Sequence, residues 1–115
     1  MPLIKVHTQP AVADDKKEPL MGEIAQCVAD ISGKSLEYMM VVLEDADIQL
    51  GGTSSDSAYI DFRGIGGISP ESNAAITSGL CELFQTELGI SPDRVYITFT
   101  DVPAQNWGWN NKLFG

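Results

Sequence analysis

Cysteine, histidine and long apolar runs are scarce in this sequence, and each shortage excludes a class of protein. Two cysteines, Cys27 and Cys81, make no disulfide framework, and both fall on helix-like segments where a free cysteine usually acts as a small buried apolar group. Only one histidine is present, His7, and no residues have metal-ligand spacing, so we expect no metal. The sequence has neither the roughly 20 apolar residues of a membrane span nor the apolar core of a signal peptide. We therefore expect a cytoplasmic protein without a membrane partner, for which export without a leader stays open.

Positive charge is scarce as well. Lysine and arginine number 7 against 16 aspartate and glutamate, which gives a net charge of -9. Such a field repels nucleic acid, so we expect no nucleic-acid partner, and an anionic substrate needs a local cation. The length of 115 residues, with 43% hydrophobic and 20% charged residues, indicates one globular domain over residues 1–115.

The first half of the chain has the pattern strand, helix, strand. Alternating apolar residues in "MPLIKVHTQ" predict a strand directly behind Pro2. Removal of Met1 would leave a secondary amine at the start of this strand, which is a candidate catalytic base. Apolar residues three or four apart predict a helix over about residues 18–32, with Gly33 as its cap, and residues 37–45 read as a buried strand.

The second half repeats this pattern. Residues 58–63 alternate as a half-buried strand, and residues 70–88 follow Ser69 as a helix with Pro70 at its first position and Gly89 at its end. Residues 94–101 form the last regular strand.

The two halves match at an offset of 56 residues, where Gly33 corresponds to Gly89 and Asp45 to Asp101. Two copies of one β-α-β unit, each with parallel strands, predict an α+β fold. In it, a four-stranded mixed sheet carries two helices on one face. The other face needs a cover, which predicts oligomerisation.

The tail, residues 102–115, has no helical period but carries several large apolar residues. Trp107, Trp109, Leu113 and Phe114 lie among Gly, Asn and Pro. Such side chains are costly to leave in water, so we expect them to pack on a neighbouring surface, around a ligand or back onto their own subunit.

Several pieces in order resemble one known family. Pro2, the "GK" at residues 33–34, the "GG" at 51–52, "ISPDRVYI" over 90–97 and "GWNN" over 108–111 are similar to the macrophage migration inhibitory factor family of the tautomerase superfamily. The resemblance covers essentially the whole chain. It implies a homotrimer with active sites at the subunit boundaries, and keto-enol tautomerisation of phenylpyruvate-like 2-oxo acids without a cofactor. Dopachrome-type compounds are the family's test substrates.

The resemblance also implies the site residues. Pro2 is the general base, Lys34 pairs with the substrate carboxylate, and the backbone amide of Ile65 contacts the substrate. The remaining matched pocket positions are Tyr38, Tyr96 from the adjacent subunit, Trp109 and Phe114. From the residues alone, Lys34 reads as a lysine favoured by a helix C-terminus and the tyrosines as strand packing groups.

Two positions and one short segment depart from the family pattern. Thr98 replaces a usual asparagine in the substrate site, and Trp107 stands where a small aliphatic residue is familiar, so the pocket rim is expected to be narrower. Residues 57–60 replace the Cys-x-x-Cys of some relatives, so we expect no dithiol oxidoreductase activity.

Two other functions remain open at this point. A non-catalytic, cytokine-like interaction protein of the same fold would keep Pro2 as a relic, and its receptor is unknown. Hydration or dehalogenation of unsaturated acids would need arginines to hold the acid. Arg63 and Arg94 are the only arginines, and their strand positions argue against it.

Overall fold

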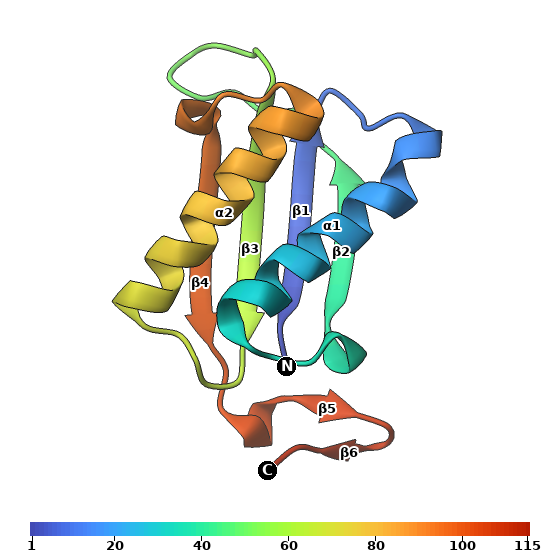
Figure 1. The fold of residues 1–115 in the computed structure, drawn as a ribbon, viewed down its shortest axis with the longest axis vertical. Helices are drawn as coiled ribbons and strands as arrows, with labels where there is room; N and C mark the ends of the chain where they lie inside the picture. The colour runs from blue at the N-terminus through green and yellow to red at the C-terminus, as the bar shows by residue number, and fades with distance from the viewer.

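The computed structural model describes residues 1–115 and contains the two expected β-α-β units. The first unit consists of β1 (Leu3–Gln9), α1 (Asp14–Ser32) and β2 (Met40–Asp45), and the second of β3 (Ser57–Gly64), α2 (Pro70–Leu88) and β4 (Val95–Asp101). Both helices lie on the same face of the sheet (Figure 1). No helix is long and apolar enough to cross a membrane.

The four strands form one mixed sheet in the order β2-β1-β3-β4. Within each unit the two strands are parallel, and the units join through the antiparallel pair β1 and β3. The register places Val6 beside Leu43 on one side and Ile60 on the other. The predicted fold class is confirmed.

α2 begins and ends where its local signals predict. The hydroxyl of Ser69 accepts a hydrogen bond from the backbone N–H of Ser72 at 3.1 Å, and Pro70 occupies the first helical position. Gly89 closes the helix in the left-handed conformation, with φ of 67°.

α1 begins four residues earlier than the sequence indicates, at Asp14 rather than Glu18. Pro19 lies in the second turn of the helix, where the missing N–H of proline removes one backbone hydrogen bond near the helix start. The carboxylates of Asp14 and Asp15 in the first turn face the positive end of the helix dipole, which favours the earlier start.

The expected buried strand over residues 37–45 is wrong at its start and in its burial. A 3₁₀ turn, η1 (Leu36–Tyr38), precedes the strand. β2 lies at the edge of the sheet and is only partly buried, because helix α1 covers only one of its two faces. Met40 in this strand is 61% exposed.

The core lies between the sheet and the two helices. The residues pointing inward alternate along the strands, as period-two burial requires, and the largest buried side chain is Phe84 of α2. The cysteines Cys27 and Cys81 are partly exposed free thiols, not fully buried as expected, and Cys27 lies beside Gly79 of α2.

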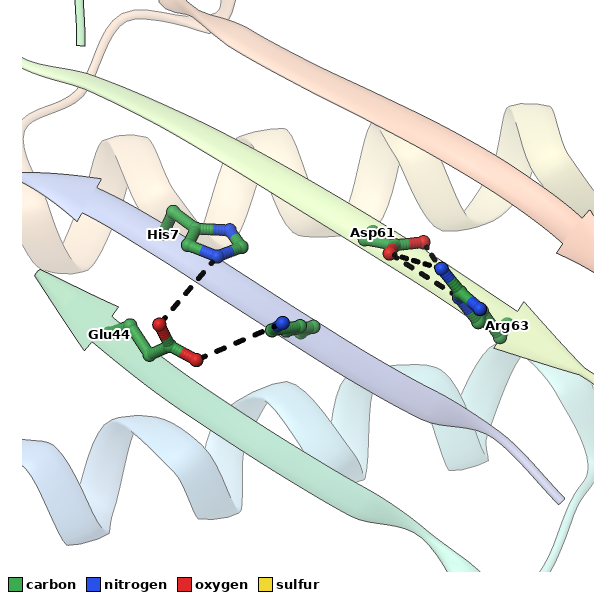
Figure 2. Close-up of polar contacts among 5 residues, drawn as sticks. His7, Glu44, Asp61 and Arg63 are labelled. Carbon is green, nitrogen blue, oxygen red and sulfur yellow. Dashed lines mark hydrogen bonds and ion pairs between the residues drawn. The ribbon is translucent and has the colours of Figure 1, made fainter. Parts of the chain in front are cut away.

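The opposite face of the sheet is open and carries paired charges. Glu44 lies 4.0 Å from the ammonium of Lys5 and 3.9 Å from Nε2 of His7, and Arg63 contacts Asp61 at 3.2 Å (Figure 2). The ring of His7 also stacks on Tyr59. In this single chain the face has no covering layer.

The tail is regular where the sequence shows no period. A 3₁₀ turn, η2 (Pro92–Arg94), precedes β4. After β4, the tail forms a second 3₁₀ turn, η3 (Ala104–Asn106), and two short antiparallel strands, β5 (Gly108–Trp109) and β6 (Lys112–Leu113). Asn110 and Asn111 form the two-residue turn with φ of 50° and 68°. Asparagine tolerates positive φ, so this pair favours a hairpin turn, a signal that the spacing of apolar residues does not contain.

Candidate active site

An apolar cleft opens beside the N-terminus. The tail hairpin lies at this end of the sheet (Figure 1). The cleft has a volume of about 480 Å³. Most of its wall is apolar. The lining residues are Met1, Leu3, Glu37, Tyr38, Met39, Met40, Trp107, Gly108, Trp109 and Phe114.

Three aromatic rings pack together at this cleft. The rings of Trp109 and Phe114 stack with centroids 5.8 Å apart, and Tyr38 meets Trp109 edge-on at 5.5 Å. The tail therefore folds back on its own chain, one of the outcomes the sequence left open. Trp109 keeps 51% of its surface exposed.

Lys34 lies just after the C-terminal cap of α1 and reaches the bend that follows β3. Its Nζ donates to the backbone oxygen of Ile65 at 3.0 Å and of Gly66 at 2.9 Å. An ammonium has three donors, so one remains for another acceptor. Lys34 takes part in none of the ion pairs of the chain, so its charge is available to an anion.

At the N-terminus, Met1 is partly buried and lines the cleft, and Pro2 is fully buried. Pro2 is enclosed immediately before β1, and its carbonyl accepts from the amide of Met40 at 3.1 Å. Proline suits this place because the ladder needs only its carbonyl. Burial, and secondly the charge of Lys34, lower the pKa of the Met1 amino group below its ordinary value.

Tyr96 and Thr98 are not brought to this cleft in one chain. Both project from β4 toward the open face, and Tyr96 is 62% exposed. Tyr96 pairs with Tyr59, which in turn pairs with His7, five residues along β1 from Pro2. At about 3.3 Å per residue this is a separation of about 16 Å. The hydroxyl of Thr98 lies 2.8 Å from that of Tyr59.

The two arginines are occupied elsewhere. Arg63 pairs with Asp61, and Arg94 donates to four backbone carbonyls and one hydroxyl around the loop between β2 and β3. Neither arginine lines the cleft. The ion pair of Arg63 and the hydrogen bonds of Arg94 argue against the hydration reading, which needs arginines to hold the acid.

Sequence reasoning missed two residues near the site. Met40 lies beside Leu3 on the cleft wall, whereas the sequence pattern placed it in a buried strand. Asp101 accepts a hydrogen bond from the amide of Gly66 at 3.1 Å. The repeat located Asp101 at a strand end but carried no signal that it meets the bend 35 residues earlier.

Known proteins share both the sequence and this architecture. The sequence description of the macrophage migration inhibitory factor (MIF) family matches residues 1–115. Macrophage migration inhibitory factor of Rattus norvegicus is 36% identical over 115 residues, covering 99% of each chain. A homologue from Prochlorococcus marinus is 30% identical with a TM-score of 0.92, covering 98% of this chain and 99% of that one. The MIF-like protein of Entamoeba histolytica is 22% identical and shares the fold, with a TM-score of 0.93 and 98% of each chain covered. The match over the full length establishes that this chain belongs to the macrophage migration inhibitory factor family.

Proposed function

We propose that the protein is a keto-enol tautomerase of phenylpyruvate-like 2-oxo acids, with Pro2 as general base once Met1 is removed. Membership of the MIF family, in the tautomerase superfamily, supports a tautomerase or MIF-like function. The observation that carries the finer proposal is the N-terminal environment. The Met1 amine there is partly buried near the Lys34 charge, and both effects lower its pKa, so an amine at this place loses its proton more readily than in water.

The chemistry follows from that environment. While Met1 is attached, the Pro2 nitrogen is an amide without a basic lone pair. After removal it is a secondary amine, and burial together with Lys34 favours its neutral form. The nitrogen takes a proton from the carbon next to the substrate ketone, the electron pair moves to the ketone oxygen, and protonation of that oxygen gives the enol. The net change is the transfer of a proton from carbon to oxygen without oxidation or reduction, so the reaction calls for no cofactor.

Lys34 is the proposed partner of the substrate carboxylate. Its remaining donor and unpaired charge support this role, because a hydrogen bond between an ammonium and a carboxylate is stronger than one between neutral groups. The net charge of -9 makes such a local cation necessary for an anionic substrate. The backbone amide of Ile65, whose carbonyl holds Lys34, is the proposed second contact. The apolar cleft would take the aryl group between Tyr38, Trp109 and Phe114, with Trp107 narrowing the rim.

We propose a homotrimer with the active sites at the subunit boundaries. The open sheet face and the exposed Tyr96 support it. Tyr96 lies about 16 Å and Thr98 about 10 Å from Pro2 along the strand direction, and both project to the open face, which supports their joining the cleft from a second copy. Sedimentation equilibrium should give three chain masses, and a monomer at micromolar concentration would contradict this assembly.

The test is turnover of phenylpyruvate by the wild type and by Pro2→Gly, each with Met1 removed. Loss of a positioned base should lower kcat/KM by about 10²- to 10⁴-fold. Pro19→Ala, which alters an exposed proline in the second turn of α1, serves as the matched control and should retain wild-type rates. Equal turnover by Pro2→Gly would remove the enzyme proposal and favour a non-catalytic interaction protein.

A further inference from the structure

We propose that Asp101 is a positioning residue that orients the Lys34 ammonium through the bend formed by residues 64–67. This inference rests on the proposed function, because it assigns a role in binding the substrate carboxylate. Asp101 is the last residue of β4, and its side chain points into the bend that follows β3.

The end of β4 fastens this bend at two points. The Oδ1 of Asp101 accepts from the Gly66 amide at 3.1 Å, and the Val102 amide donates to the Gly64 carbonyl at 2.8 Å. The first contact depends on a side chain and the second does not. A substitution at Asp101 therefore loosens the middle of the bend while its base stays attached to β4.

The residues fixed by Asp101 are the ones that hold Lys34. The Gly66 amide binds Asp101, and the carbonyls of Ile65 and Gly66 accept two of the three protons of Nζ. The direction of the third proton is then set by the positions of two carbonyls. Movement of the Gly66 peptide would shift both acceptors and leave the ammonium free to rotate.

Close packing against the next residue of the bend also confines the lysine. Gly66 and Gly67 both have positive φ, of 69° and 73°, which favours glycine in this bend. A Cβ on Gly67 would lie 3.1 Å from Cε and 3.3 Å from Nζ of Lys34. The bend therefore passes close beside the lysine side chain at residues 65–67.

Hydrogen bonding and charge can be separated at this position. Asparagine keeps an oxygen acceptor for the Gly66 amide and removes the charge, whereas alanine removes both. The repeat offers a matched control in Asp45, which occupies the corresponding end of β2 and has no side-chain hydrogen bond. No ion pair joins Asp101 to Lys34, so Asp101→Asn should resemble the wild type.

The experiment measures calorimetric binding of 3-phenylpropionate, an aryl carboxylate that has no ketone to enolise. Asp101→Ala should weaken its affinity by about tenfold, while Asp101→Asn and Asp45→Ala should stay within about twofold of the wild type. In a Lys34→Ala background, Asp101→Ala should have no further effect, because the lysine it positions is absent. With phenylpyruvate, Asp101→Ala should raise KM more than it lowers kcat.

Two results would overturn the role of Asp101. One is wild-type affinity in Asp101→Ala. The other is an equal loss caused by Asp101→Ala with and without Lys34.

A further measurement keeps the test independent of the proposed function. In the wild type, the two Cε protons of Lys34 should have distinct NMR shifts, assigned by their loss in Lys34→Ala. They should merge in Asp101→Ala and stay distinct in Asp101→Asn. If no form binds the acid, the substrate proposal fails, and merged shifts in the wild type would overturn the positioning role separately.

Discussion

The Nζ of Lys34 donates to the backbone oxygen of Ile65 at 3.0 Å, across 31 positions of sequence. This contact joins the end of the first helix to the bend after β3, and so connects the two repeated halves at the end of the sheet where Pro2 lies. It also holds a cation near the N-terminal amine without neutralising it. Substrate binding and tuning of the base can therefore depend on the same side chain.

Removal of the Lys34 charge should shift the pH dependence of turnover. With Met1 absent, only the neutral Pro2 amine acts as base, so kcat/KM falls as pH drops through its pKa. The nearby cation disfavours the protonated amine, and Lys34→Ala should raise that pKa. The acid limb of the kcat/KM profile should move to higher pH. Lys17→Ala, which removes a cation paired with Asp14 in the first turn of α1, should leave the limb in place.

An acid limb unchanged in Lys34→Ala would contradict this electrostatic link. A drop in kcat/KM without a shift would assign Lys34 to carboxylate binding alone.

The two thiols should react slowly with iodoacetamide near neutral pH. Burial raises the pKa of Cys81, and burial followed by the charges of Asp30 and Glu82 raises that of Cys27. Thiolate is the reactive form, so both should alkylate more slowly than N-acetylcysteine. Asp30→Asn should speed alkylation of Cys27, measured by peptide mass spectrometry, and leave Cys81 unchanged. Equal acceleration of both thiols would point to loosening of the fold.

The glycines of the two helices should respond differently to alanine. A Cβ on Gly22 of α1 meets nothing within 4 Å, so Gly22→Ala should stabilise the fold by about 0.5–1 kcal/mol through helix propensity. A Cβ on Gly79 of α2 would lie 2.7 Å from Cδ1 of Ile31 and 3.0 Å from Sγ of Cys27. Gly79→Ala should therefore lack that gain in urea unfolding. An equal gain at both sites would show that the helices separate easily.

Arg94 should be a strong determinant of stability. Its guanidinium donates to the carbonyls of Leu50, Thr53, Ser55 and Asp56 and to the hydroxyl of Ser57. Loss of these bonds in Arg94→Ala should lower the free energy of unfolding by about 2–3 kcal/mol. Arg94→Lys should recover only part of this, because an ammonium cannot reproduce the planar set of donors. The paired surface residue Arg63 is the control, and Arg63→Ala should cost under about 1 kcal/mol. Similar losses at both arginines would contradict the assignment.

The sequence predicted those parts of the fold that depend on local chemistry. The ends of α2 are set by capping contacts within a few residues, at Ser69 and Pro70 and at Gly89. The repeat predicted the two parallel strand pairs. The start of α1 was placed too late, because the apolar spacing begins only at Leu20 and the first turn, with Asp14 and Asp15, is polar.

Features that depend on contacts distant in the sequence could not be predicted in the same way. The bond between Asp101 and Gly66 arises only when β3 and β4 pair, and no periodicity reports it. The resemblance named Tyr38, Trp109 and Phe114 together, and the structure does bring them into contact. Their roles in substrate binding stay predictions, as do those of Tyr96 and Thr98.

The most direct test compares two forms of the N-terminus in the same phenylpyruvate assay, each verified by intact mass. One is the wild type without Met1, and the other carries one alanine inserted before Pro2. The structure holds Met1 ahead of a buried Pro2, so an additional residue fits without loss of the fold. The insertion converts the Pro2 nitrogen into an amide. The account predicts that turnover falls by about 10²-fold or more, and equal turnover by the two forms would contradict it.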